Sequence, residues 1–529
     1  MKTLKQSTLL IMAFSIATRL MSFFFKIYLS RRVGAEILGL FQMTFSVFGL
    51  FYMIAGSGIP LMLSRKTAEL SAFKGREKEL DGVVTGAILL SLGIVLLLIG
   101  GTLIFRKGLP LIFSDRRCVK LFLLLLPALL STVIYQLLRA YFMGRGRFFD
   151  YSVTELSEEA IKIVACLTFL SNGVILLSDS VAITIAFLVT DYAVMVLLLV
   201  LYFIKGGRFA KPCSTKAILR ASLPVTGMRV AAGLLTSFIA ICLPAALVRN
   251  GMTPGDATAE YGRAVGMAVS LLFAPLSLTS ALSIVILPKA ASLAATGEWK
   301  ELRLRVNESI LFIFAITVLF YVLFLVLGES FGELLFKDAR AGRFVSFSSG
   351  MVVPAALSGL INTTLNSLGE EKKVFLSFSL SSALLILCVI FLPRYIGIYA
   401  LSIGECAFYL TDFILGMCFL WKRGGYSAAI FKPAAIMMTL AFPTALSAKL
   451  CQLLLPAKGI FLRTALPTIV GCLVYLLLLL LFKPIPEIRT MILKNPLKRK
   501  KKRMEKEKSA HSGPSSTLSK QRSKLSPQD

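Results

Sequence analysis

Two cations interrupt the first long apolar stretch of the sequence. Arg19 and Lys26 lie seven residues apart in IATRLMSFFFKI, residues 16–27. In a helix this spacing corresponds to about 700° of rotation and about 10 Å of rise, so both side chains lie on one face. A charge inside hydrocarbon costs about 2.5–3.5 kcal/mol on insertion scales and therefore faces a wet cavity or a partner. The spacing predicts a cationic stripe for an anion, and arginine suits phosphate through paired hydrogen bonds.

Other cations also lie inside apolar segments. Arg229 belongs to the first predicted helix of the second half of the chain, so the first helices of both halves carry cations. Arg139 and Arg263 are further candidates for an anion site, although both lie near predicted helix ends, from which long side chains can extend to the membrane interface. Lys449 could be an interfacial anchor of the same kind. The pattern favours a central cavity for an anionic substrate.

Three acidic residues are also expected at membrane depth: Asp191, Glu405 and Asp412. Carboxylates in such places could bind a coupling cation, or they could form ion pairs with nearby cations. The charged segment ELSEEAIK, residues 155–162, has acidic and basic residues three and four positions apart. We expect it to be the solvated start of a helix in which Lys162 pairs with a neighbouring glutamate. A gate is the alternative.

The residue types that most enzymes need are scarce in the sequence. His511 is the only histidine, and the nine cysteines are scattered without a CxxC pair. The sequence therefore predicts no metal site, haem or disulfide framework. The P-loop pattern GxxxxGK[ST] does not occur, so the chain is not an ATP-driven pump on its own. We expect no cofactor and no enzymatic activity.

The apolar segments are long enough to cross a membrane. Hydrophobic residues make up 56% of the 529-residue chain. Runs such as TALPTIVGCLVYLLLLLLF, residues 464–482, reach the roughly 20 residues that span about 30 Å of hydrocarbon. The recurrence of such runs predicts an all-α polytopic membrane protein. Fourteen spans are predicted, at residues 7–29, 37–62, 83–105, 119–142, 157–177, 180–204, 219–248, 262–287, 309–328, 344–367, 374–393, 398–421, 434–455 and 460–482.

Charge in the loops predicts the orientation. Lysine and arginine are frequent in loops on the side of the N-terminus, for example at 65–78, 205–216 and 289–305, and rarer in most of the opposite loops. The loop after the third span, with four cations at 106–117, is an exception. The positive-inside rule then places both termini in the cytoplasm. Residues 483–529 form a basic tail that we expect to be disordered, either attracted to anionic lipids or simply solvated. It has no aromatic residues to stack on bases, so we expect no nucleic-acid partner.

The two halves of the chain echo each other. PALLSTVIYQLL at 127–138 matches PAALSGLINTTL at 354–365, and AEILG at 35–39 matches AEYG at 259–262, with offsets of 227 and 224 residues. Duplication in the same direction gives two pseudo-symmetric lobes with a substrate site between them. A duplicated bundle without a cavity is the alternative. The predicted domains are an N-terminal lobe (1–205), a C-terminal lobe (206–421), two extra helices (422–482) and the tail (483–529).

Several strings along the chain resemble the stage V sporulation protein B group, which is of polysaccharide-flippase type within the multidrug/oligosaccharidyl-lipid/polysaccharide (MOP) exporter superfamily. The resemblance runs in order from the first helix to about residue 420. The strings that carry it are GIPLMLSRKTAEL (58–70), LRAYFMGRGR (138–147), TELSEEAIKI (154–163), LPVTGMRV (223–230), AEYGRAVGMAVSLLFAPL (259–276), ALSIVILPKAASLAA (281–295) and LNSLGEEKK (365–373).

The resemblance implies a MATE-like and MOP-like fold, with fourteen helices in two lobes around a V-shaped cavity and alternating access. It also implies a lipid-linked glycan substrate, in particular an undecaprenyl-pyrophosphate peptidoglycan precursor. Related lipid II flippases carry an arginine in helix 1 after a small hydroxyl residue, and Thr18-Arg19 matches that position. Arg263 matches a second cavity arginine. A third basic position falls near Tyr52, and the sequence has RAYFMG where the group tends to show RGYFQG.

Residues and resemblance together predict a flippase of the bacterial cell membrane that moves an anionic lipid-linked saccharide outward. The expected substrate contacts come from Arg19, Lys26, Arg229, Arg263 and Arg139. A cation-coupled multidrug exporter of the same superfamily is the alternative, and it would call for acids where the first helix has cations. Besides the lipid-linked precursor, the expected partners are anionic membrane lipids at the basic tail and cell-wall synthesis enzymes.

Overall fold

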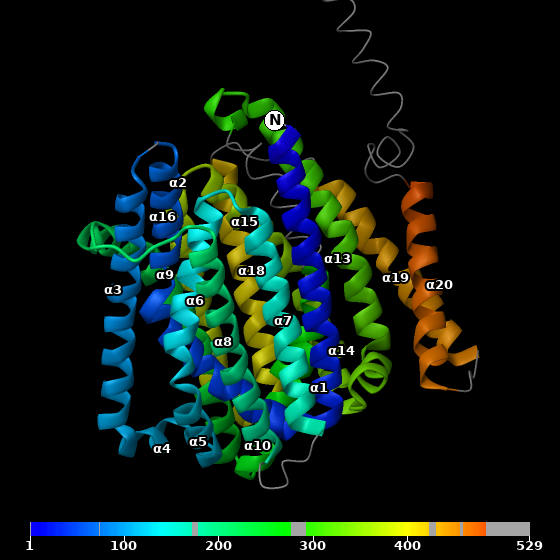
Figure 1. The fold of residues 1–529 in the computed structure, drawn as a ribbon. Coiled ribbons are helices and arrows are strands. Elements are labelled where there is room, and N and C mark those ends of the chain that lie inside the picture. Colours follow the sequence, from blue (N-terminus) through cyan, green and yellow to red (C-terminus); the bar gives the residue numbers. More distant parts are fainter. Residues whose placement is uncertain are drawn as a thin grey trace, which may run out of the picture.

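The computed structural model describes residues 2–73, 75–171, 178–276, 292–422, 430–454 and 459–482, with side chains from residue 13 onward. Every regular element in these ranges is a helix, so the predicted all-α class is confirmed for the described part of the chain. The helices stand side by side as a bundle, with the beginning of the chain at one end (Figure 1). We call this end the N-terminal face and the other end the opposite face.

The first helix, α1 (Lys2–Gly56), is broken once and consists of two arms. At Gly34 the backbone has φ 80° and ψ 177°, a non-helical conformation that glycine adopts at little cost. A straight helix of 55 residues would be about 80 Å long, far beyond the roughly 30 Å of hydrocarbon. The break turns the chain back at the opposite face. The second arm continues after Ser57 and Gly58 into α2 (Ile59–Ser71).

The longer helices in the rest of the first half run between the two faces, and the short η1 and α4 lie between α3 and α5 along the chain. A bend of 49° separates α5 from α6, at Leu126 and Pro127, where proline begins a new helix. The elements are α3 (Glu77–Ile104), η1 (Arg106–Gly108), α4 (Leu109–Ile112), α5 (Arg116–Leu125), α6 (Ala128–Gly144), α7 (Phe148–Ser171) and α8 (Asp179–Ile204).

The second half repeats this plan. Its second span begins as α10 and continues through a π-helical segment, η2, and its fourth is broken by a 3₁₀ turn, η3. The elements are α9 (Thr215–Arg249), α10 (Pro254–Tyr261), η2 (Gly262–Ala268), α11 (Val269–Leu272), α13 (Trp299–Phe336), α14 (Ala339–Ser348), η3 (Ser349–Met351), α15 (Val352–Ser367), α16 (Glu371–Phe391), α17 (Pro393–Ile396), α18 (Tyr399–Lys422), α19 (Phe431–Leu454) and α20 (Ile460–Phe482).

By length and composition, ten helices of the described residues could cross a membrane, or eleven if α5 and α6 form one bent span. The fourteen predicted ranges all contain helical residues, but four of them count differently. The two arms of α1 count once together with α2. The charged α7 falls outside the ten, and the predicted span 262–287 leaves the described residues after 276. The multi-pass prediction holds, and the number fourteen stays a prediction.

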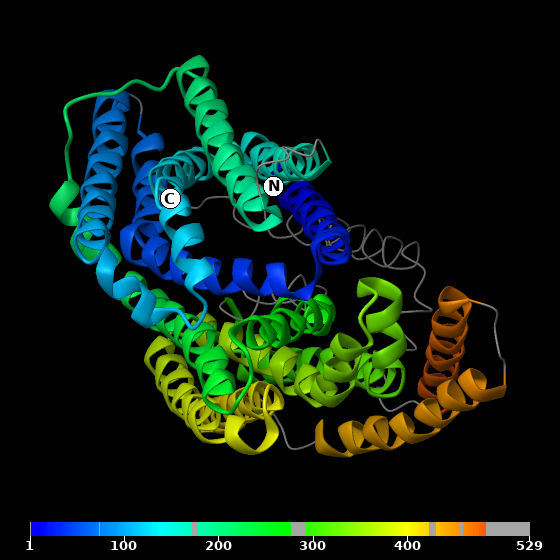
Figure 2. The same cartoon turned by 90° about the horizontal axis from the view of Figure 1, so that it is seen from below.

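The two halves lie on opposite sides of the bundle, as seen from below in Figure 2. The helices α19 and α20 pack on each other and on α13, at one edge of the molecule (Figures 1 and 2). The segment between the halves lies against α3, where the amide of Cys213 donates to the carbonyl of Gly82 at 3.1 Å and that of Ala210 donates to Thr85 Oγ1 at 3.1 Å. The predicted lobe boundaries remain predictions.

Candidate functional site

A cavity of about 440 Å³ lies between the two arms of α1 and the helices α7, α8 and α9. Most of its lining is apolar or uncharged. The charged residues among those that line it are Lys26, Glu159 and Lys162. Lys26 Nζ also lies 3.5 Å from Ser270 Oγ on α11, so this cation stands where the first half meets the second. The cavity therefore brings one predicted site residue into a polar cluster at the junction of the halves.

Arg19 lies on the same arm of α1, two turns closer to the N-terminal face than Lys26, and its side chain is exposed. It is close enough to Glu155 on α7 for the two charges to interact. The described lining of the 440 Å³ cavity includes Lys26 and does not include Arg19. The two predicted members of the cationic stripe thus share a helix arm but not this cavity.

The segment 155–162 is not the solvated helix start that the sequence suggested. It lies in the middle of α7, which begins at Phe148. Glu159 and Lys162 do pair, with 2.8 Å between Oε2 and Nζ, but their side chains are only 7% and 16% exposed. The early start of α7 moves these charges down into the bundle, where they face Lys26. Sequence reasoning missed both as cavity residues.

Arg139 is buried and does not extend to an interface. Its guanidinium forms an ion pair with Glu158 Oε2 at 2.7 Å, donates to the carbonyl of Thr154 at 2.8 Å, and lies over the ring of Tyr135 at 5.1 Å. These contacts join α6 to α7. The arginine is therefore held by the protein itself, as a link between two helices of the first half.

Arg229 joins the two halves at the N-terminal side of the cavity. Its Nη1 donates to the carbonyl of Ser57 at 2.7 Å, at the interruption between α1 and α2. The residue is otherwise exposed. The carbonyl groups at the end of a helix carry partial negative charge, so a cation is favourable there.

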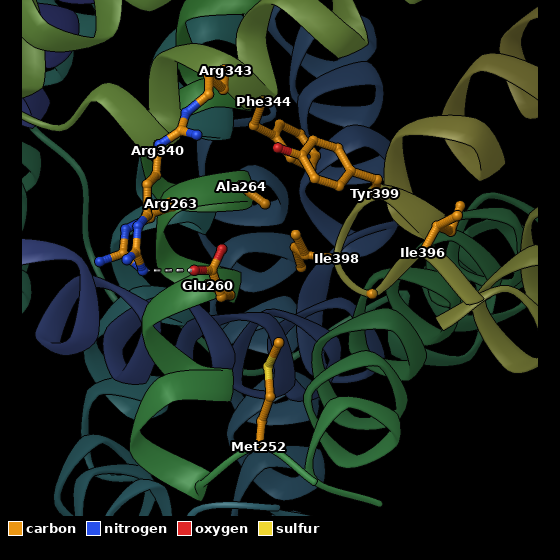
Figure 3. Close-up of a pocket in the computed structure, with 11 residues that line it drawn as sticks. Met252, Glu260, Arg263, Ala264, Arg340, Arg343, Phe344, Ile396, Ile398 and Tyr399 are labelled. Carbon is orange, nitrogen blue, oxygen red and sulfur yellow. Dashed lines mark hydrogen bonds and ion pairs between the residues drawn. The ribbon is translucent and has the colours of Figure 1, made fainter. Parts of the chain in front are cut away.

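Arg263 lies in a second, separate cavity of about 290 Å³ in the C-terminal half (Figure 3). It donates from Nε to Asp338 Oδ2 at 2.8 Å and from Nη1 to Glu260 Oε1 at 2.9 Å. Arg340 also points to Glu260, with a distance of 3.7 Å. Arg263 is therefore an ion-paired residue of η2. Among the described residues, the lining of this cavity does not include Lys26, and that of the α1 cavity does not include Arg263.

Two of the three predicted acids bond to neutral polar groups. Asp191 Oδ2 accepts from Thr132 at 2.7 Å. Asp412 accepts from Ser377 at 2.5 Å and from Asn362 at 2.7 Å. These hydrogen-bond partners of Asp191 and Asp412 are thus uncharged side chains rather than the cations considered from the sequence. Glu405 has one carboxylate oxygen, Oε2, without a hydrogen-bond partner among the described residues.

The described residues contain no group of three or more side chains suited to a metal ion.

Lys449 lies at the periphery: it donates to Gln452 Oε1 at 3.1 Å and lines an apolar groove between α13 and α19. It is thus distant in the fold from the α1 cavity. Both findings leave the α1 cavity as the strongest candidate site.

The halves touch at the opposite face through two glycines. A Cβ atom on Gly39, in the second arm of α1, would collide with the carbonyl of Thr258, and one on Gly262 would collide with the carbonyl of Ala35. Glycine therefore lets the backbones of α1 and of the α10–η2 segment cross in direct contact. Close by, Thr258 Oγ1 lies 3.4 Å from Asp115 Oδ2.

Arginine adds a second connection between the halves at this face. Arg31, near the end of the first arm of α1, donates from Nε to the carbonyl of Leu335 at 2.7 Å and from Nη2 to that of Leu334. These are among the last carbonyls of α13. A positive charge at a helix C-terminus interacts favourably with the helix dipole. The sequence reasoning missed Arg31, because it lies at a predicted span end where arginine is common.

Two aspartates outside the spans are held ionised at the opposite face. Burial alone would raise the pKa of Asp115, but hydrogen bonds from the side chain and backbone of Arg117 outweigh burial and hold it below the ordinary value. Burial would likewise raise the pKa of Asp338, but the backbone amide of Ala341 and the side chain of Arg263 hold it below the ordinary value. Both carboxylates also cap helices, α5 and α14.

Known proteins share sequence with this chain over most of its length. The family described as "Polysaccharide biosynthesis protein" matches residues 4–294, more than half of the chain. Stage V sporulation protein B of Bacillus subtilis (strain 168) is 22% identical over 382 residues, which cover 69% of this chain and 73% of that protein. The resemblance read from the quoted strings is therefore confirmed.

Solved structures share the fold. The lipid II flippase MurJ, in an inward closed conformation, matches with a TM-score of 0.70 at 13% identity, over 90% of this chain and 98% of that one. An inward-facing multidrug resistance MATE family transporter of the MOP superfamily matches with a TM-score of 0.64 at 15% identity, over 77% and 94%. The predicted MATE-like and MOP-like fold of a multi-pass membrane protein is confirmed. These two structures are those of a flippase and of a transporter.

Proposed function

Because the chain belongs to the polysaccharide biosynthesis protein family, we propose that it is a flippase that moves an anionic lipid-linked saccharide outward across the bacterial cell membrane. The proposed cargo is an undecaprenyl-pyrophosphate precursor of peptidoglycan or of another polysaccharide. The observation that carries the proposal is the α1 cavity, where Lys26 faces a polar cluster at the junction of the two halves.

Alternating access fits the way the halves meet. We place both termini and the N-terminal face in the cytoplasm, with fourteen spans, two lobes (1–205 and 206–421), two further helices (422–482) and a basic tail (483–529) that attracts anionic lipids. The contacts of Gly39 with Thr258 and of Gly262 with Ala35, which we call the glycine crossing, then close the opposite face in this conformation. In this orientation the opposite face is the outer one. Separation of the lobes at that crossing would open the cavity outward.

We assign each cation a role in cargo binding from its position in or near the cavity. Lys26 contacts the diphosphate group in the cavity, and Arg19 meets it earlier, on the cytoplasmic part of the same arm. Arg229 is exposed beside the α1–α2 interruption and completes the cationic path. Arg139 supports the site indirectly, because its ion pair with Glu158 joins α6 to α7. Arg263 is held in its own ion pairs in the separate cavity. The lipid tail stays in the bilayer.

A cation-coupled multidrug exporter is the second candidate. The observation in its favour is that Asp191, Asp412 and Glu405 place carboxyl groups inside the bundle, as a transporter that exchanges cations would need. Under the flippase proposal the same acids are the candidates for binding a coupling ion. The two functions differ in the cargo, since a cationic drug would be repelled by Lys26 and Arg19.

Charge reversal tests the proposal in a host that depends on this protein. We expect Arg19→Glu and Lys26→Glu to abolish growth complementation and to cause lipid-linked precursors to accumulate, as measured by mass spectrometry of extracted lipids. Lys449→Glu is the matched control, because it reverses a cation on the peripheral α19. Full complementation by correctly expressed Arg19→Glu and Lys26→Glu would overturn the proposal, and restored drug resistance without any precursor change would favour the exporter.

A further inference from the structure

The cavity contains a lysine whose charge is already engaged by a neighbour on the same helix. Lys162 and Glu159 lie one turn apart on α7, both line the cavity, and their side chains are mostly buried. Lys162 Nζ also lies 5.5 Å from the ring centre of Phe187 on α8. A buried cation needs a counterion because water is not there to solvate it. Glu159 supplies that counterion, at 2.8 Å.

Lys26 lies across the cavity from this pair. It is close enough to both Glu159 and Lys162 for the charges to interact. The three charged residues known to line the cavity therefore carry two positive charges and one negative charge. A diphosphate diester brings two negative charges, and it would attract both lysines and repel the glutamate.

We propose that Lys162 is a second cation for the diphosphate group and that Glu159 competes with the cargo for it. When cargo enters, the Lys162 ammonium turns from the Glu159 carboxylate to a phosphate oxygen. When cargo leaves, Glu159 takes the ammonium back. The glutamate thus lowers affinity and favours release, which a flippase needs at the far side of the membrane. This inference rests on the proposed function and names a specificity pair within its site.

The structure offers a physical reason for such an exchange. Both partners are on one helix, so an ammonium group can pass from the carboxylate to a ligand by rotation of the lysine side chain alone. The remaining uncharged polar lining, Ser22, Gln42, Ser46 and Thr236, can hydrogen-bond to the group left unpaired. Arg139 is already bound to Glu158, so it does not compete for Glu159.

The test measures binding and transport separately with the purified full chain. The probes are undecaprenyl diphosphate, undecaprenyl monophosphate and undecaprenol. We expect the wild type to prefer the diphosphate, and Lys162→Gln to bind it at least about tenfold more weakly, which corresponds to about 1.4 kcal/mol. Glu159→Gln should bind the diphosphate several-fold more tightly and yet transport it more slowly in proteoliposomes, because release becomes slower.

A double variant separates this role from a purely structural one. Glu159→Gln with Lys162→Gln replaces a buried ion pair by a neutral pair that can still hydrogen-bond, so thermal stability should return to nearly the wild-type value. Under our proposal its diphosphate affinity stays as low as that of Lys162→Gln. Lys162→Arg should restore part of the affinity.

Several outcomes would overturn the inference. Recovery of affinity in the double variant, or a loss of affinity in Glu159→Gln as large as in Lys162→Gln, would mean that the pair is structural. An unchanged Lys162→Gln would have the same consequence while leaving the flippase proposal intact. If the wild type bound none of the diphosphate probe, both proposals would fail together.

Discussion

Glu36 and Glu260 hold equivalent positions in the two halves of the chain. Glu36 pairs with Arg117 at 2.6 Å, and Glu260 pairs with Arg340 at 3.7 Å. Each arginine lies two residues after the aspartate that caps the next broken span, Asp115 or Asp338. The matching pairs are 224 and 223 residues apart, close to the offset of the AEILG and AEYG strings. The repeat thus preserves an ion-pair arrangement within each half at the opposite face.

The glycine crossing between the halves predicts a shift of the access equilibrium. Gly39→Ala or Gly262→Ala should prevent the opposite face from closing, because each added Cβ would meet a backbone carbonyl. A cysteine introduced at Gln42, which lines the cavity, should then react faster with a membrane-impermeant maleimide added to whole cells.

The matched control for this experiment is Gly93→Ala on α3, where a Cβ would meet nothing within 4 Å. Labelling is read at the introduced cysteine by peptide mass spectrometry, so the native cysteines do not interfere. Equal labelling rates in Gly39→Ala and Gly93→Ala would show that the crossing does not limit access from outside.

Arg31 predicts a smaller shift of the same kind. Removing its guanidinium in Arg31→Ala releases the last carbonyls of α13 and should favour separation of the halves by about tenfold, equivalent to about 1.4 kcal/mol. Spin labels at Lys107 on η1 and at Arg394 on α17 would report longer distances. Arg32→Ala is the control, because Arg32 donates to Leu170, which belongs to the same half. Equal distance distributions in the two variants would contradict the prediction.

The buried Arg139–Glu158 pair predicts strong coupling in stability. Arg139→Met leaves Glu158 buried without its cation and should cost about 3–5 kcal/mol of unfolding free energy. The double variant Arg139→Met with Glu158→Gln should recover most of this loss, because no uncompensated charge remains. Denaturant unfolding of the purified protein in detergent measures both. Additive losses in the double variant would show that the two side chains do not depend on each other.

Acid should weaken the opposite face through Asp115 and Asp338. Since their pKa values are lower in the folded protein than in the unfolded chain, where about 3.9 is typical, they stabilise the fold above that pH. That stabilisation is lost as the pH falls through the folded-state values. The unfolding temperature of the wild type should therefore fall more steeply below about pH 4 than that of Asp115→Asn with Asp338→Asn.

Asparagine is the chosen replacement because it still caps a helix but does not titrate near this pH. Parallel curves for the wild type and the double variant would mean that other carboxylates account for the acid sensitivity of the protein.

Hydrophobicity was sufficient to predict the class of fold and most helix positions, because spans must satisfy their own backbone hydrogen bonds in lipid. The spacing grouped Arg19 with Lys26, but among the described residues Lys26 lines the α1 cavity and Arg19 does not. The positions of Glu159 and Lys162 in the cavity could not be predicted, since a charged segment with local pairing has the same sequence pattern on a solvated helical turn as on a buried one. Only the start of α7 at Phe148 distinguishes the two. Arg263 was separated from Lys26 by tertiary packing that no local pattern records.

The segment between the two halves is attached to α3 by hydrogen bonds and would therefore move together with the first half of the chain. Its amides are bonded to Gly82 and Thr85, and α9 begins directly after Ser214, where φ is 57°. A cut in the polypeptide just after Ser214 would therefore leave each fragment with all of its own helices. The two fragments, produced from separate genes in one cell, should reassemble into a working transporter by complementation.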